Sequence, residues 1–258
     1  MTQFREELTS AKASGRKLLA AYLMGGIPER LSYPAALEVL EEHADVVEVG
    51  LPFSDPLMDG PVIAAAGERV IQAGLGPHEV MDLTSETAAR RPRVVMTYYN
   101  PIHRIGEDTF CSRASAAGFR GLIVPDLPLE ESGGLRSCAR AHDLAWVALV
   151  APTSSPQRVE RIVSSCTGFV YAVSTLGVTG TREALSERAR RVVDRCRAAT
   201  DLPVLVGIGV STPEQAAEAT SYADGVVIGS AIVQLLLEQG PAAAGDFVAA
   251  VRGAVDAG

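Results

Sequence analysis

The stretch PVLVGIGVSTPEQAAEATSYADGVVIGS, residues 203–230, contains the pattern that predicts the fold. A short apolar run stands at each end, and between them lies 212–222, which has the spacing of an amphipathic helix. Ser211 or Thr212 can cap this helix, and Pro213 suits its first turn. A strand, a helix and a second strand in this order indicate one unit of a parallel sheet.

The same unit recurs along the chain. Apolar strands that alternate with helices favour a parallel sheet with both faces covered, and eight units in this length are typical of a (β/α)₈ barrel. The alternative is a doubly wound open sheet, but the turn after the first run lacks the G-x-G-x-x-G pattern. The eight runs are 18–24, 45–50, 93–99, 121–126, 145–151, 168–174, 203–209 and 224–230.

We therefore predict an α/β protein, a (β/α)₈ TIM barrel. Barrels of this kind commonly use 200 to 250 residues as one domain, so residues 1–258 are interpreted as one. A short helical N-terminal extension is expected at about residues 2–14. The spacing between the second and third runs is the longest, which predicts an extra helix there.

Composition excludes several functions. The net charge of −8 argues against a broad basic face for nucleic acid. The polar N-terminus has no signal-peptide core, and no apolar run approaches the roughly 18 residues of a membrane span. Cys111, Cys138, Cys166 and Cys196 are far apart, without CxxC spacing or a nearby His, which indicates free thiols in a reducing compartment and no metal site. We predict a cytoplasmic protein.

The second run places Glu48 among valines, and the Pro-rich loop after it carries Asp55 and Asp59. A buried carboxylate is costly unless it is paired or neutralised. Active sites of such barrels form at the C-terminal ends of the strands, where two carboxylates can divide acid and base roles. The alternative is that Glu48 pairs with a Lys or Arg inside the barrel, while the two aspartates only cap turns.

Glycine-containing turns follow the last three runs, at 174–180, 206–211 and 228–230. Glycines let backbone N–H groups approach a ligand, and a helix that starts after the last turn offers its positive N-terminus. Plain turns and caps are the alternative; a phosphate site in these loops is favoured because it recurs in this barrel. No lysine lies within a run, so a Schiff-base mechanism is disfavoured. These observations favour a cofactor-free reaction in which carboxylates act as acid and base on a phosphorylated substrate.

Several motifs resemble the tryptophan synthase α subunit family over essentially the whole chain. The first and fourth together are the most specific. The resemblance implies the (β/α)₈ fold and a retro-aldol cleavage of indole-3-glycerol phosphate to indole and glyceraldehyde 3-phosphate. The motifs are VEVGLPFSDPLMDGP (47–61), YYNPI (98–102), GLIVPDLPLEE (121–131), YAVSTLGVTGTR (171–182), VLVGIGVS (204–211) and DGVVIGSAIV (224–233).

The resemblance also implies roles for residues. Glu48 matches the general acid/base that protonates indole C3 and takes the proton of the glycerol hydroxyl, and Asp59 matches the acid that accepts the indole N–H. Tyr171 would stand near the substrate and Glu48; a core tyrosine is its alternative. Thr179 would hold Asp59 when the loop after the sixth strand closes. The residues that match the family's phosphate cradle are Gly180, Gly209, Gly229 and Ser230. Those that match its indole pocket are Tyr22, Tyr98 and Ile208.

A partner is implied in the same way. The family works as an αββα complex that passes indole to a β subunit carrying pyridoxal phosphate, which this chain itself would not bind. The β-facing surface matches Pro52, Asp55, Asn100, Asp126 and Pro128.

Three residues depart from the family pattern. Met24 and Ile27 replace polar positions near the pocket floor and the first loop, and Met58 replaces a small residue beside Asp59.

Two other functions stay open. One is a self-sufficient indole-3-glycerol phosphate lyase that releases free indole. The other is a non-catalytic barrel that binds a sugar phosphate or activates a partner, against which Glu48 and Asp59 argue. Another phosphate-binding barrel, such as an indoleglycerol-phosphate synthase or an isomerase, is disfavoured because no lysine stands at a strand end.

Overall fold

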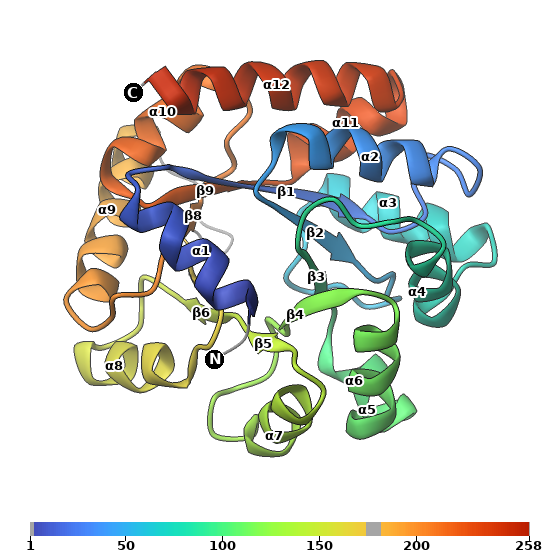
Figure 1. Ribbon diagram of the computed structural model, residues 1–258, viewed down its shortest axis with the longest axis horizontal. Coiled ribbons are helices and arrows are strands. Elements are labelled where there is room, and N and C mark those ends of the chain that lie inside the picture. Colours follow the sequence, from blue (N-terminus) through green and yellow to red (C-terminus); the bar gives the residue numbers. More distant parts are fainter. Residues whose placement is uncertain (1–2, 174–181, 258) are drawn as a thin grey trace.

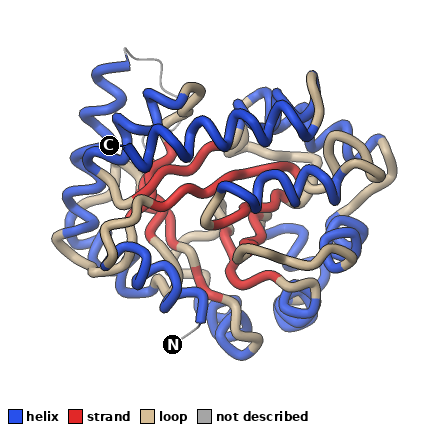
Figure 2. Tube along the Cα trace, turned by 45° about the horizontal axis from the view of Figure 1, so that its top comes forward, coloured by secondary structure: helices blue, strands red, loops and turns tan. Residues whose placement is uncertain are grey.

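The computed structural model describes residues 3–173 and 182–257, with side chains from 187 onward in the second range. All strand pairs are parallel, in the order β5-β4-β3-β2-β1-β9-β8-β7-β6, and helices surround the strands (Figures 1 and 2). The strands are β1 (Leu18–Met24), β2 (Val46–Gly50), β3 (Arg93–Met96), β4 (Phe119–Ile123), β5 (Ala145–Trp146), β6 (Ala148–Val150), β7 (Val170–Val173), β8 (Val204–Gly207) and β9 (Gly225–Ile228).

The sheet closes on itself at the fifth apolar run. That run is split into β5 and β6 at Val147; β5 pairs with β4, and β6 pairs with β7. The Val147 N–H donates to the carbonyl of Leu122 on one side, and the carbonyl of Trp146 accepts from the N–H of Gly168 on the other. The eight predicted runs thus form the eight strand positions of a (β/α)₈ barrel, with β5 and β6 together filling the fifth. The open-sheet alternative is wrong.

The helices form the outer layer. Both α3 and α4 lie between β2 and β3, which confirms the extra helix, and Thr212 caps α10 by accepting from the N–H of Gln215. The helices are α1 (Gln3–Ala13), α2 (Tyr33–His43), α3 (Pro61–Gln72), α4 (Pro77–Ser85), α5 (Tyr99–Ile105), α6 (Glu107–Ala116), α7 (Gly133–Ala141), α8 (Pro156–Ser165), α9 (Arg182–Arg197), α10 (Pro213–Tyr222), α11 (Ser230–Glu238) and α12 (Pro241–Ala257). None of the described helices is long and apolar enough to cross a membrane.

Helix α1 confirms the predicted N-terminal extension and covers the N-terminal end of the barrel. Phe4 and Leu8 are buried in the same apolar cluster as the inward-facing side chains Ala20, Val46 and Val94. The Phe4 ring lies edge-on to that of Phe169, with centroids 6.5 Å apart. The floor of the barrel is therefore filled with hydrocarbon, and the opposite, C-terminal end is left for the site.

Charged side chains at the floor hold the starts of the strands. Asp45 accepts from the N–H of Leu19 at 2.9 Å and from the Arg252 guanidinium at 3.0 Å. Asp224 does the same at β8, accepting from the N–H of Val204 at 3.0 Å. These aspartates are paired with cations and backbone donors, so their burial is compensated.

Candidate active site

Glu48 points into the barrel from the middle of β2. Its register partners are Tyr22 on β1 and Val94 on β3, and Val46, two residues earlier on the same strand, belongs to the interior cluster. Side chains two residues apart on a strand share a face. Only 1% of Glu48 is exposed, so the carboxylate stands in the apolar interior, just below the mouth.

Glu48 differs from the other buried carboxylates of the described residues. Glu41 pairs with Arg93, and Asp45 and Asp224 pair with arginines. Glu48 Oε2 has no hydrogen-bond partner among the described residues. Burial, together with the charge of Asp59, raises the pKa of Glu48 to about 8. No Lys or Arg of the described residues pairs with Glu48, which contradicts the alternative of an ion pair inside the barrel.

Asp59 stands beside Glu48 at the end of the loop that follows β2. The loop leaves the barrel through Pro52 and returns at Asp59, directly before α3. Asp59 is half-buried, and this burial raises its pKa to about 6, while a hydrogen bond from Tyr98 acts in the opposite direction. Two carboxyl groups with separate pKa values thus face one mouth.

Three tyrosines surround this acid pair. Glu48 and Asp59 raise the pKa of the buried Tyr22 hydroxyl further above the level set by its burial, and Glu48 does the same to Tyr171 on β7. Tyr98 follows β3 and hydrogen bonds the loop of Asp59. Tyr171 accordingly lies close enough to Glu48 to respond to its charge, and Tyr22 and Tyr98 stand at the mouth.

Glycines make room for two of these rings. A methyl group at Gly50 would collide with the Tyr22 hydroxyl, and one at Gly207 would lie 2.7 Å from Tyr171 Cε2. Gly229 also contacts Tyr22, since a methyl group there would lie 3.3 Å from its Cδ1. The sequence pattern predicted a phosphate site at the glycine turns that include Gly207 and Gly229 and assigned no role to Gly50; that these glycines receive tyrosine rings becomes visible only when the strands are assembled.

The predicted phosphate residues lie at neighbouring strand ends. Gly209 follows β8 with a positive φ of 68° and no atom within 4 Å of where a side chain would begin. Gly229 directly follows β9 and is the N-cap residue of α11, whose first residue Ser230 is exposed. Ile208, from the predicted indole pocket, is half-buried beside Gly209. Thr179 and Gly180 lie outside the described residues.

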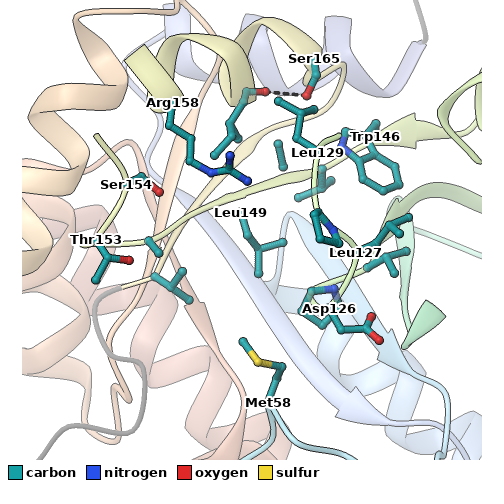
Figure 3. A pocket seen from close by; sticks show the side chains of 18 residues that line it. Met58, Asp126, Leu127, Leu129, Trp146, Leu149, Thr153, Ser154, Arg158 and Ser165 are labelled. Carbon is teal, nitrogen blue, oxygen red and sulfur yellow. Dashed lines mark hydrogen bonds between the residues drawn. The ribbon is translucent and has the colours of Figure 1, made fainter. Parts of the chain in front are cut away.

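A cavity of about 490 Å³ opens beside the mouth (Figure 3). Met58 and Asp126 lie at one end and Arg158 at the other, with Leu149 of β6 between them. Neither Tyr22 nor Tyr98 nor Ile208 contributes to it. Leu149 is not among the residues predicted from the sequence, although its alternation with Val147 along the fifth run indicates an inward side chain.

The departures from the family pattern lie in different places. Met24 packs against α3, where a methyl group at Gly67 would be 3.3 Å from its Cε, and Ile27 is fully buried. Both belong to the apolar layer between strands and helices rather than to the pocket floor. Met58, by contrast, is 46% exposed at the mouth.

Comparisons with known proteins agree with this geometry. A family model described as tryptophan synthase alpha chain matches residues 8–252. The tryptophan synthase alpha chain of Streptomyces avermitilis is 48% identical over 243 residues, 93% of this chain and 88% of that relative. A chain in a structure of Mycobacterium tuberculosis tryptophan synthase superposes with a TM-score of 0.91 at 39% identity, over 98% of both chains. The chain belongs to the tryptophan synthase alpha chain family.

Similarity extends to distant organisms. The tryptophan synthase alpha chain of Methanocaldococcus jannaschii is 39% identical over 234 residues, 90% of this chain and 83% of that relative. As a tryptophan synthase alpha chain, this protein acts in tryptophan biosynthesis, and its reaction is that of a lyase.

The residues predicted to face a β subunit lie around the mouth of this alpha chain. Asp55, Asn100, Asp126 and Pro128 are exposed, whereas Pro52 is buried at the start of its loop. Pro52 and Asn100 together line a cavity of about 680 Å³ between the loop after β2, the α3–α4 turn and α5. Pro52 is therefore a wall of this cavity rather than an exposed contact.

The chain's two lysines lie at the barrel floor. Lys12 Nζ is 3.3 Å from Asp224, and Lys17 donates to the carbonyl of Ala223. A Schiff base at the mouth of this alpha chain is thus excluded. In the part of the chain that the structure describes, no group of three or more His, Cys, Asp or Glu side chains could hold a metal ion.

Proposed function

We propose that this alpha chain cleaves indole-3-glycerol phosphate to indole and glyceraldehyde 3-phosphate by a retro-aldol reaction in which Glu48 and Asp59 are the catalytic residues. One observation carries the proposal: a buried, unpaired carboxyl with a pKa of about 8 stands beside a second with a pKa of about 6 at the barrel mouth. At neutral pH the first is protonated and the second is ionised, as an acid and a hydrogen-bond acceptor require.

Glu48 is assigned both proton transfers. Its carboxyl proton goes to indole C3, which leaves a positively charged indolenine ring. The resulting carboxylate takes the proton of the adjacent glycerol hydroxyl, and the bond between C3 and the glycerol carbon breaks. The electron pair of that bond restores the indole ring, the glycerol carbon becomes an aldehyde, and Glu48 is protonated again.

Asp59 is assigned the role of acceptor. Its carboxylate accepts a hydrogen bond from the indole N–H and stabilises the positive charge that the ring gains when C3 is protonated. The charge of Asp59 also favours the protonated form of Glu48, because two carboxylates this close resist ionising together. Each acid thus supports the protonation state that the other needs.

The phosphate group is assigned to the ends of β8 and β9. Gly209 leaves space beside its backbone, and the N-terminus of α11 presents N–H groups at Gly229 and Ser230. Gly180 and Thr179 are retained as predictions, as is the aromatic side of the indole pocket at Tyr22, Tyr98, Tyr171 and Ile208.

A β subunit is proposed as the partner in an αββα complex, with pyridoxal phosphate on the β subunit. The tip of the loop that carries Asp59 supports this assignment, because Leu57 is 92% exposed and Met58 is 46% exposed. Exposed apolar side chains beside Asp55 suit a protein contact. The exposed Asn100, Asp126 and Pro128 extend the same surface.

Indole release from indole-3-glycerol phosphate, with and without a tryptophan synthase β subunit, tests the function. We expect slow release by the isolated chain and strong acceleration by the β subunit. Fast release without it identifies the self-sufficient lyase, and no release under either condition overturns the proposed reaction. Glu48→Gln and Asp59→Asn should each lower the rate by at least about 10²-fold. A near-normal rate of either variant in the complex would overturn the role assigned to that residue and favour the non-catalytic activator.

Two further points stay predictions. The cytoplasm is the predicted location, in keeping with four free cysteines. A single domain spanning 1–258 is the predicted organisation.

A further inference from the structure

A polar groove lies on the outer side of the barrel between α7 and α8. Its volume is about 420 Å³, and it adjoins the cavity of Figure 3, because Leu129 and Ser165 line both. The other described residues that line it are Glu130, Arg136, Arg161 and Ser164. The hydroxyls of Ser164 and Ser165 donate to carbonyls of their own helix, so the two guanidinium groups are its free donors.

Arg136 is a half-buried arginine whose side chain has no partner. It makes no hydrogen bond or ion pair with the described residues, and its Nε is covered from solvent. Arg93 and Arg252 also have one unpartnered nitrogen each, but their guanidinium groups are paired with Glu41 and Asp45. A covered donor has lost its water without gaining an acceptor, which is costly. An anion in the groove would supply that acceptor.

The carboxylate of the groove is held by a different arginine. Glu130 accepts from Arg158 through both of its oxygens, at 2.9 and 3.1 Å. Arg161 approaches only one of these oxygens, at 3.2 Å. Together with Arg136, three guanidinium groups stand against one carboxylate, which leaves two positive charges uncompensated.

Other acids near α7 lie against α5 instead. Glu107 accepts from the Tyr99 hydroxyl at 3.0 Å, and the charge of Glu131 also raises the pKa of Tyr99. Glu130 is the one acid among the described residues that line the groove. An incoming anion therefore meets mainly the charge of the arginines.

We propose that this groove is a second anion site, which binds the doubly charged phosphate group of a small molecule through Arg136 and Arg161. Guanidinium groups match phosphate oxygens in pairs, and the two uncompensated charges match a dianion. None of the residues assigned to the substrate phosphate lines the groove. The site therefore does not depend on the proposed reaction.

Equilibrium dialysis with radiolabelled inorganic phosphate tests the site. It is carried out at constant ionic strength and above about pH 7, where a phosphate group carries close to two charges. Ser230→Asp is the background, because its charge repels phosphate from the assigned substrate site, and this variant should still bind phosphate in the groove. Adding Arg136→Gln should weaken that binding at least about tenfold. The matched control is Arg140→Gln, at an exposed position of the same helix outside the groove, which should leave it unchanged.

A second variant keeps the test decisive if Arg136→Gln does not fold. Arg161, whose side chain is 62% exposed, tolerates replacement more easily, and Arg161→Gln should weaken phosphate binding in the same way. Loss of all phosphate binding in Ser230→Asp alone would overturn the proposal. So would equal binding by the Arg136→Gln and Arg140→Gln proteins.

Glycerol 3-phosphate, used in place of inorganic phosphate, distinguishes two sources of the ligand. Tighter binding of the ester identifies a phosphate monoester, and equal binding identifies free phosphate. If the substrate phosphate does not bind at the ends of β8 and β9, Ser230→Asp leaves the total phosphate bound unchanged. The assignment of that site then fails, whereas the arginine variants still decide whether the groove binds phosphate.

Discussion

Burial and the charge of Asp59 raise the pKa of Glu48 to about 8, and among the described residues no cation compensates a negative charge there. The buried acids at the floor of the barrel are paired with arginines, whereas Glu48 faces tyrosines and Asp59. The same carboxyl group is therefore a structural anion at one end of the barrel and a proton donor near the other. Its position along the strand decides which.

At the residue scale we expect a bell-shaped pH profile of kcat/KM. Activity should fall on the acid side as Asp59 is protonated, near pH 6, and on the basic side as Glu48 loses its proton, near pH 8. The measurement is the steady-state rate of cleavage by the complex at a series of pH values between 5 and 9. A profile that is flat across this range would contradict the assignment of the acid pair.

The free energy of unfolding should also depend on whether Glu48 is protonated. The pKa of Glu48 is about 8 in the folded protein against an ordinary value of 4.5, so its contribution to stability is complete below about pH 4.5 and is lost as the pH rises through 8. Glu48→Gln cannot ionise, and its free energy of unfolding should exceed that of the unchanged protein at pH 9, by at most about 5 kcal/mol. Urea unfolding at pH 5 and 9 measures this.

The control for that measurement is Glu38→Gln, the same change at an exposed position of α2. An equal response of both variants to pH would show that burial of Glu48 is not the cause.

Neighbouring strands pack together at the mouth by placing a glycine on one strand against a tyrosine on the next. Gly50 at the end of β2 receives the Tyr22 hydroxyl from β1, and Gly207 at the end of β8 receives the Tyr171 ring from β7. Neighbouring strands can thus carry large side chains near the mouth of the barrel without being pushed apart. The tyrosine hydroxyls stay beside the acids because the next strand has no side chain at that point.

At this scale we expect Gly50→Ala to destabilise the protein by about 1–3 kcal/mol, because the new methyl group forces the Tyr22 ring out of place. Gly253→Ala adds the same methyl group at an exposed position of α12 with nothing within 4 Å. It should be neutral or stabilise by up to about 1 kcal/mol. Chemical denaturation of both variants decides, and an equal effect would rule out the steric explanation.

The whole molecule separates a stable end from a reactive end. The floor is filled by α1 and by ion pairs, including Arg93 with Glu41, which joins β3 to α2. The mouth keeps its cavities, the acid pair and an exposed apolar loop tip. Changes at the floor should affect folding, and changes at the mouth should affect reaction and assembly.

For the assembly we expect Leu57→Asp to weaken stimulation by the β subunit at least about tenfold, since it places a charge in the proposed contact. The rate of the isolated chain should change little, because Leu57 is 92% exposed. Titration of indole release with β subunit gives both values. Leu31→Asp is the matched control, with the same exposure in the loop before α2; if it weakens stimulation equally, Leu57 is not a specific contact.

The sequence by itself determined the eight strands, the N-terminal helix, the extra helix and the two acids. These depend on periodicity and on local preference, which act over a few neighbouring residues. It also located Gly209, Gly229 and Ser230 at neighbouring strand ends.

Only the tertiary structure decided what faces each side chain. Glu48 has no paired cation among the described residues, Tyr98 accepts from the Met58 N–H, Gly50 and Gly207 receive tyrosine rings, and Leu149 lines a cavity. All of these depend on segments far apart in sequence. Closure of the barrel brings these strands together, and burial among them sets the pKa values. The sequence supplied the acids; the assembled barrel gave them their protonation states.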